Sequence, residues 1–162
     1  MIRLSRALSP LLALTLAAVL ANCSTSQKGT GGEIVKASYY KLDAAKRVYA
    51  ADPAIPFEQK HYLHGAVTRE EQAAREGHYY TFFWQADDRS QPVNARLQYR
   101  QKGTGSAVHE KSIEVAQLRR TNKTKFDVIG DEFATNGKVT AWKFTLEQGG
   151  NEIASTKSYL WD

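Results

Sequence analysis

From residue 78 onward, apolar and polar residues alternate along the chain with a period of two. In the segment 93–100, Val, Ala, Leu and Tyr take every second position, and Asn, Arg and Gln fill the positions between them. Successive side chains of a strand point to opposite faces, so this alternation predicts a strand with one buried and one wet face. The segment 78–85 is denser in aromatic residues, which is typical of a central strand.

Turn residues separate further apolar segments. Gly, Asn, Asp and Pro cluster at 87–92, 103–106, 136–137 and 148–151. Between these turns we predict strands over 107–115, 124–129, 139–146 and 153–161. Six to eight strands with such spacing favour a mainly β fold, an antiparallel β-sandwich. The region after His78 resembles an immunoglobulin-like or fibronectin-type sandwich, but the chain has one cysteine and no disulfide of that kind can form.

The first half of the chain is less regular. We predict a strand over 57–67, while 34–56 can be read either as a strand starting near Ile34 or Tyr39 or as a short helix that Asp43 caps. A sharper pattern follows at Thr68, because Glu71 stands three residues later, at the spacing of a capping box. This spacing predicts one short helix near 69–76, which Gly77 terminates.

The last two strands can pair in more than one register. If residue 146 lay opposite 153, Lys157 would lie beneath Trp142, which is implausible in a core. A slip of one residue pairs Trp142 and Phe144 with Ser158 and Thr156, or with Thr156 and Ala154. We therefore predict that the Trp142 face carries the small residues of the last strand and Leu160.

The N-terminus carries a basic start, an apolar run and then the sequence Leu20-Ala21-Asn22-Cys23. This order is typical of a secretory signal, and its end resembles a bacterial lipoprotein signal, although Asn22 stands where a small residue is usual. The resemblance implies that 1–22 is removed and that Cys23 is lipidated and binds the bilayer. The alternatives are an uncleaved membrane anchor, for which the apolar run is short, and an ordinary signal peptide with an incidental cysteine.

The rest of the chain then divides into two parts. Ser, Thr and Gly dominate 23–33, so we predict a flexible tether there and a single β-sandwich domain over 34–162. Ser24 is not the aspartate that marks inner-membrane retention in proteins that the signal resembles. The expected location is therefore the outer membrane, facing the periplasm, if the cell has two membranes.

The charge pattern adds little to this picture. The net charge is +5, and removal of Arg3 and Arg6 lowers it to +3. The densest basic group is Arg119, Arg120, Lys123 and Lys125, which we interpret as a solvated loop and strand edge. It allows an attraction to anionic lipid headgroups, and we predict no nucleic-acid partner.

No arrangement of residues in the sequence points to catalysis. The four histidines, His61, His64, His78 and His109, lie at no recognisable metal-ligand spacing. There is no Gly-x-Ser-x-Gly and no His-Glu-x-x-His motif. We therefore predict no catalytic residues, no metal site and no cofactor.

The aromatic residues around 80 supply the candidate binding surface. If Tyr80, Phe82 and Trp84 face the core, then Tyr79 and Phe83 face outward, where Tyr62 could join them. Exposed rings on a sheet can bind sugars or a protein, unless the helix near 69–76 covers them. The leading hypothesis is a non-enzymatic envelope lipoprotein that binds an envelope protein in an assembly; the alternatives are a carbohydrate-binding module and, more distantly, a hydrolase.

Overall fold

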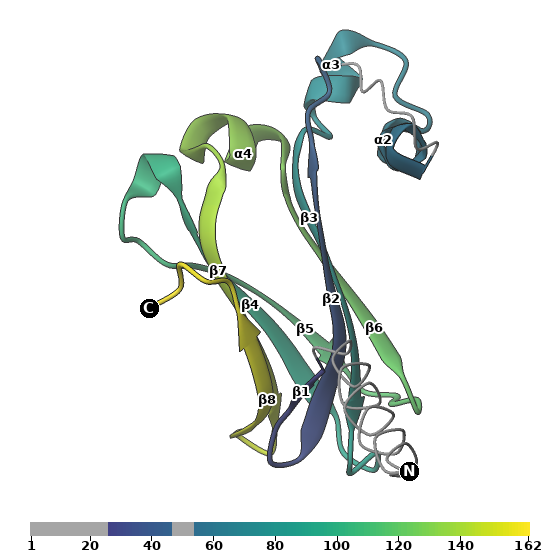
Figure 1. Cartoon of the computed structure of the whole chain (residues 1–162), viewed down its shortest axis with the longest axis vertical. Helices are drawn as coiled ribbons and strands as arrows, with labels where there is room; N and C mark the ends of the chain where they lie inside the picture. The colour runs from purple at the N-terminus through teal and green to yellow at the C-terminus, as the bar shows by residue number, and fades with distance from the viewer. Residues whose placement is uncertain (1–25, 47–53) are drawn as a thin grey trace, which may run out of the picture.

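Two antiparallel four-stranded sheets pack face to face (Figure 1) in the computed structural model, which describes residues 26–46 and 54–162. The first sheet has the order β1-β2-β3-β6 and the second the order β5-β4-β7-β8. This arrangement confirms the predicted mainly β, sandwich-like architecture. The strands are β1 (Gln27–Lys28), β2 (Gly32–Leu42), β3 (Gly77–Ala86), β4 (Val93–Gln101), β5 (His109–Val115), β6 (Asn122–Ile129), β7 (Val139–Gln148) and β8 (Asn151–Lys157).

The period-two pattern places the core correctly. In β3, Tyr80, Phe82 and Trp84 are buried between the sheets, while Tyr79 and Phe83 are half-buried on the outer face, as predicted. In β4 every second residue from 93 to 101 is fully buried. Burial of large apolar side chains of this kind contributes about 1.5–3 kcal/mol each and is the main stabilising term for the fold.

The C-terminal hairpin adopts one of the two predicted slipped registers. Phe144 lies opposite Thr156, and the backbone N–H and O of Trp142 both bond to Ser158. The strand ends at Lys157, however, so the prediction that Leu160 joins the Trp142 face is wrong: Leu160 is 65% exposed. The chain turns there, because the N–H of Trp161 donates to the carbonyl of Ser158.

A helix that ends at Leu63, followed by a turn, occupies the segment 57–67, for which the sequence predicts a strand. This helix, α2 (Ala54–Leu63), packs on the outer face of the first sheet through its ring contacts. The Gln59 side chain also donates to the carbonyl oxygens of Asp43 and Lys46. The strand prediction is wrong because these contacts come from residues distant in sequence, and no local pattern reports them.

The predicted capped helix is present as α3 (Arg69–Ala73), but it ends before residue 76: its C-cap is Ala74, and Gly77 begins β3 instead of terminating the helix. The Glu71 N–H donates to the Thr68 hydroxyl at 3.1 Å, and the Thr68 N–H donates back to the Glu71 carboxylate at 3.0 Å. A further helix, α4 (Gly130–Asn136), and a short 3-10 turn, η2 (Lys102–Thr104), were not predicted. The described part of the chain therefore holds more helix than the single one expected.

The stretch predicted as a flexible tether is partly ordered. Gln27 pairs with Ile34, so 27–33 belongs to the first sheet. Gly29 approaches the second sheet so closely that a Cβ there would lie 2.0 Å from the carbonyl oxygen of Ile153. Only glycine fits this contact, and the Gly residues that suggested flexibility instead permit close packing.

For 34–56, the structure decides between the predicted strand and the predicted short helix only up to residue 46. Residues up to Leu42 form β2, and Asp43 to Lys46 are not helical. The remainder of the alternative helix, up to Ala50, lies outside the described residues, as do the signal segment and Cys23. Among the described residues, no helix is long and apolar enough to cross a membrane.

Candidate binding surface on the first sheet

The outer face of the first sheet carries three rows of side chains across β2, β3 and β6. Antiparallel register sets these rows, because outward residues directly opposite one another are neighbours. From the α2 end toward the β1 end, the rows are Tyr40–Tyr79–Asp127, Ser38–Thr81–Lys125 and Lys36–Phe83–Lys123. The surface thus changes from tyrosines to hydroxyls to an aromatic ring between two lysines.

Tyr62 of α2 covers the first row. Its ring centroid lies 5.0 Å from that of Tyr40 and 4.1 Å from that of Tyr79. The Tyr79 hydroxyl donates to the carbonyl oxygen of Arg75 at 2.6 Å. Burial raises the pKa of Tyr79 to about 12, and burial also raises the pKa of Tyr62. Both phenols are therefore neutral at physiological pH and act through their rings and hydrogen bonds.

A hollow of about 460 Å³ lies beside this cluster; we call it the outer-face hollow. It brings together Tyr62, Tyr79 and Phe83, the three residues proposed from the sequence as a ligand or partner surface. The helix that borders it is α2, which supplies lining residues, and not the helix near 69–76 that was expected to cover this face. The other lining residues are Ser38, Tyr39, Tyr40, Glu58, His61, Thr81, Lys123 and Lys125.

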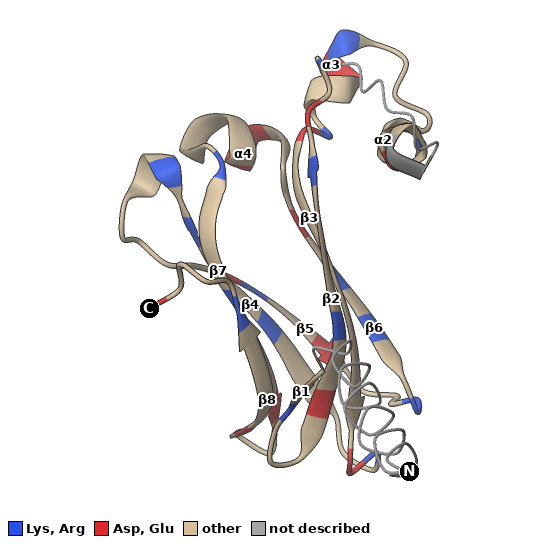
Figure 2. Cartoon of the chain, viewed as in Figure 1, with Lys and Arg blue, Asp and Glu red and all other residues tan. Residues whose placement is uncertain are grey.

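The end of the hollow around Phe83 is basic. The Lys123 ammonium lies 5.3 Å from the centroid of the Phe83 ring, a cation–π contact. Lys36, Lys123 and Lys125 are all exposed, and none forms an ion pair within the described residues. Figure 2 shows this basic colouring on β2 and β6.

The outer face of the second sheet is different, because its charges are paired. Arg96 contacts both Glu110 and Glu147, and Lys143 Nζ lies 3.2 Å from Glu152. Basic groups with carboxylate neighbours attract a ligand less than unpaired ones do. The unpaired lysines on the outer face of the first sheet therefore favour an anionic ligand at that face.

The rings of this surface are predictable from the sequence, but its lysines were not recognised there. Lys123 and Lys125 were grouped with Arg119 and Arg120 and interpreted as a solvated strand edge. Their spacing of two residues, interleaved with buried Thr124 and Phe126, is the signal that places both on one outer face. Lys36 carries no such signal, since only the pairing with Phe83 brings it into the row.

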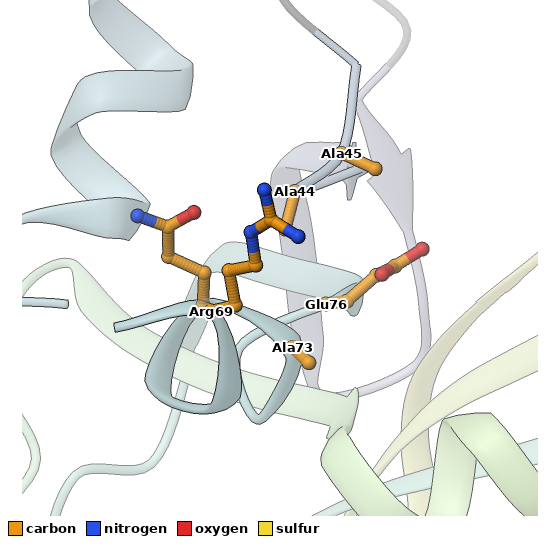
Figure 3. A pocket seen from close by; sticks show the side chains of 6 residues that line it. Ala44, Ala45, Arg69, Ala73 and Glu76 are labelled. Carbon is orange, nitrogen blue, oxygen red and sulfur yellow. The ribbon is translucent and has the colours of Figure 1, made fainter. Parts of the chain in front are cut away.

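A second hollow, of about 430 Å³, lies between α3 and the chain after β2 (Figure 3). Among the described residues, its walls are Ala44, Ala45, Gln72 and Ala73, with Arg69 and Glu76 as the charged groups. One acid and one base on walls of this kind do not make a nucleophile–base pair. We assign no chemistry to this hollow.

The histidines are not gathered into a site. His61 lies in the last turn of α2 and His64 directly follows that helix, so neither lies on the strand predicted over 57–67. Within residues 26–46 and 54–162, no three His, Cys, Asp or Glu side chains come together as metal ligands would. His78 is buried and bridges the two sheets, since the Val139 N–H donates to its Nε2.

Fold and surface together define a β-sandwich with a basic, ring-lined hollow on one outer face. Comparison with models of protein families, with curated proteins and with solved structures finds no match. The function is therefore argued from the geometry of this chain alone.

Proposed function

We propose that this protein is a lipid-anchored lipoprotein of the bacterial envelope, and that its sandwich is a non-enzymatic binding module. The observation that carries the proposal is the convergence of Tyr62, Tyr79 and Phe83 around one hollow. Rings and unpaired lysines at the same place suit binding, and the neutral tyrosines contribute ring surfaces and hydrogen bonds. Lipidated Cys23 is the membrane anchor in this proposal.

The length of the chain before β1 supports an arrangement close to the membrane. Three residues separate Cys23 from Gln27, and four steps along an extended chain span at most about 14 Å. The β1 end of the sandwich would therefore lie near the bilayer. In Figure 1, α2 lies at the end of the first sheet opposite β1. The hollow runs from α2 to the Phe83 row nearer β1, so its tyrosine end would be presented away from the anchor to a partner in the envelope.

The anchor is tested by Cys23→Ser, with Ser24→Ala as the matched control. We expect Cys23→Ser to lose incorporation of labelled fatty acid and to leave the membrane fraction after a high-salt wash. Ser24→Ala should behave as the parent protein does. Retention of Cys23→Ser in washed membranes would show that something else holds the protein there.

The location is tested by density fractionation of the two membranes, where the cell has two. We expect the protein in the outer-membrane fraction, facing the periplasm, because Ser24 follows the cysteine. Recovery in the inner membrane would contradict this part of the proposal without affecting the assignment of the binding surface.

The binding surface is tested by crosslinking in intact cells through a photoreactive residue placed at Phe83. The same residue placed at Tyr159, which is 96% exposed in the C-terminal tail, is the control. We expect adducts specific to position 83. Equal adducts at both positions, or none at 83, would argue against the outer-face hollow as the docking surface.

A further inference from the structure

We propose that the outer-face hollow binds an anionic saccharide, a sugar that bears carboxylate or phosphate groups. The proposal rests on the proposed function, since it names the ligand class of the same surface. Two features carry it. Lys123 and Lys125, which line the hollow, and Lys36, opposite Phe83, form no ion pair within the described residues, and the Phe83 ring lies among them on the outer face of the sheet.

The lysines are close enough to act on one ligand. Lys36 and Lys123 flank Phe83 on the neighbouring strands, and strands about 4.8 Å apart put their backbones about 10 Å from each other. Lys125 lies one row further along, about 7 Å away. An acidic sugar is of this size, so its charged group can meet two ammonium groups while its ring lies between them.

Two acids lie near the lysines, and neither forms an ion pair with them among the described residues. Glu58 of α2 lines the hollow near Tyr40 and Tyr62, at its α2 end. Asp127 lies in the tyrosine row, two residues beyond Lys125. Lys111 approaches it from the other side, with its Nζ 4.0 Å from the carboxylate and 2.6 Å from the backbone oxygen. The charge around Phe83 is thus left for an anion from outside the protein.

The neutral groups around the lysines match a sugar rather than a bare anion. Phe83 is half-buried and supplies an apolar ring surface against which the C–H face of a pyranose can pack. Ser38 and Thr81 stand opposite each other in the next row, and each hydroxyl can donate and accept a hydrogen bond, as sugar hydroxyls require. Tyr62 and Tyr79 close the hollow at its α2 end.

An acidic peptide fits this surface less well. An extended peptide recognised by a sheet usually adds as a strand to an open edge, and β6 is such an edge. A strand added to β6 would place its outward side chains beside Lys123 and Lys125, but it would leave Phe83 on β3 and Lys36 on β2 without contact. The charged row and the ring favour a ligand that lies across the face.

Binding is measured with the full chain in non-ionic detergent at low salt. The probes are tetragalacturonate for carboxylates and glucose 6-phosphate for phosphates, each against an uncharged match, maltotetraose and glucose. We expect at least one acidic probe to bind about tenfold more tightly than its match or better, and to weaken by a similar factor at high salt because the lysines are exposed. Absence of this preference for both probes would overturn the proposal.

Three variants test whether the acidic probe binds at Phe83 and the lysines around it. The double variant Lys123→Gln/Lys125→Gln should weaken the acidic probe about tenfold, while Lys143→Gln, on the outer face of the second sheet, should not. Phe83→Leu should weaken the acidic sugar but leave the binding of inorganic phosphate unchanged. If Lys143→Gln has the same effect as the double variant, the interaction is diffuse attraction and the proposal fails.

Two further probes separate other ligand classes. Equal or tighter Lys123-dependent binding of hexaglutamate, or of vesicles containing phosphatidylglycerol, would replace the saccharide by an acidic peptide or a lipid surface. Equal binding of inorganic phosphate and glucose 6-phosphate would show that packing of the sugar against the Phe83 ring does not contribute to affinity. In these cases crosslinking at position 83 can still succeed, so failure of the ligand class is distinguishable from failure of the docking surface.

Discussion

The rings of Phe82 and Phe144 lie parallel, with their centroids 3.8 Å apart and their planes 2° from each other. Phe82 belongs to β3 and Phe144 to β7, so this contact joins the two sheets. Both side chains are fully buried, and Phe126 of β6 packs edge-on against both rings. The stacked pair is therefore a central contact of the core.

Phe82→Ala should cost about 3–5 kcal/mol of unfolding free energy, because it removes a large buried ring and leaves a cavity. A double-mutant cycle with Phe144→Ala should show a coupling of about 0.5–1.5 kcal/mol. Denaturant unfolding measures both quantities. The control is Phe57→Ala on α2, a side chain that is 67% exposed. An equal loss in the control would argue that stability does not depend on the stacked pair.

The surroundings of His78 predict that the free energy of unfolding depends on pH. Its Nε2 accepts the Val139 N–H at 3.3 Å, so the neutral ring carries its hydrogen on Nδ1, 2.7 Å from the Tyr39 hydroxyl. Burial first, and then the charges of Lys41 and Lys138, lower the pKa of His78 to about 4. Protonation would also break the bond to Val139.

The unfolded chain therefore binds this proton more readily than the folded one, since the usual pKa of histidine is near 6.5. Stability from His78 is complete above about pH 6.5 and falls as the pH drops toward 4, by about 3 kcal/mol in total. Unfolding free energy measured from pH 7 to pH 4 in the parent and in His78→Gln checks this. The variant, although less stable at pH 7, should show a shallower slope; parallel curves would contradict the assignment.

Thr68→Ala should destabilise the start of α3 by about 1 kcal/mol, because the Glu71 N–H loses its acceptor. Thr68→Ser keeps the hydroxyl and should change stability much less. Amide exchange at Glu71 reports the local effect directly. Unaltered exchange in Thr68→Ala would mean that water replaces the cap without cost.

Two truncations separate the contribution of the C-terminal tail, after Ser158, from that of β8. A chain that ends at Ser158 loses the contact of Trp161 with Arg100 and the ion pair of Asp162 with Lys157. The ion pair is exposed and the contact of Trp161 with Arg100 is half-buried, so the expected cost is about 1–2 kcal/mol. The melting temperature of this variant should stay close to that of the parent protein.

A chain that ends at Glu152 loses Ile153 and Ala154 from the core and leaves β7 as an edge strand, paired with β4 alone. This truncation should abolish cooperative melting. Trp142→Ala should also be severe, at about 3–5 kcal/mol, since Trp142 packs edge-on against Tyr80 and Phe82. If the chain that ends at Glu152 still melted cooperatively at the parent temperature, β8 would be dispensable for the fold.

The alternation of apolar and polar residues by itself determines much of the fold. In β3 and β4 a buried side chain at every second position leaves only one way to face the core, because a strand turned over would expose Phe82, Trp84 and Leu97. The Thr68 cap is also predictable, since both of its hydrogen bonds connect residues within one turn. The outward position of Tyr79 and Phe83 follows from the same alternation.

The helix α2, the ordered residues around Gly29 and the row of lysines are decided only by the tertiary structure. α2 is held by the rings of Tyr40 and Tyr79, which its own residues cannot reveal. Gly29 is indistinguishable from a linker glycine until Ile153 approaches it. Lys36 meets Phe83 and Lys123 through the pairing of strands separated by 40 or more residues, and local sequence carries no information about such distant partners.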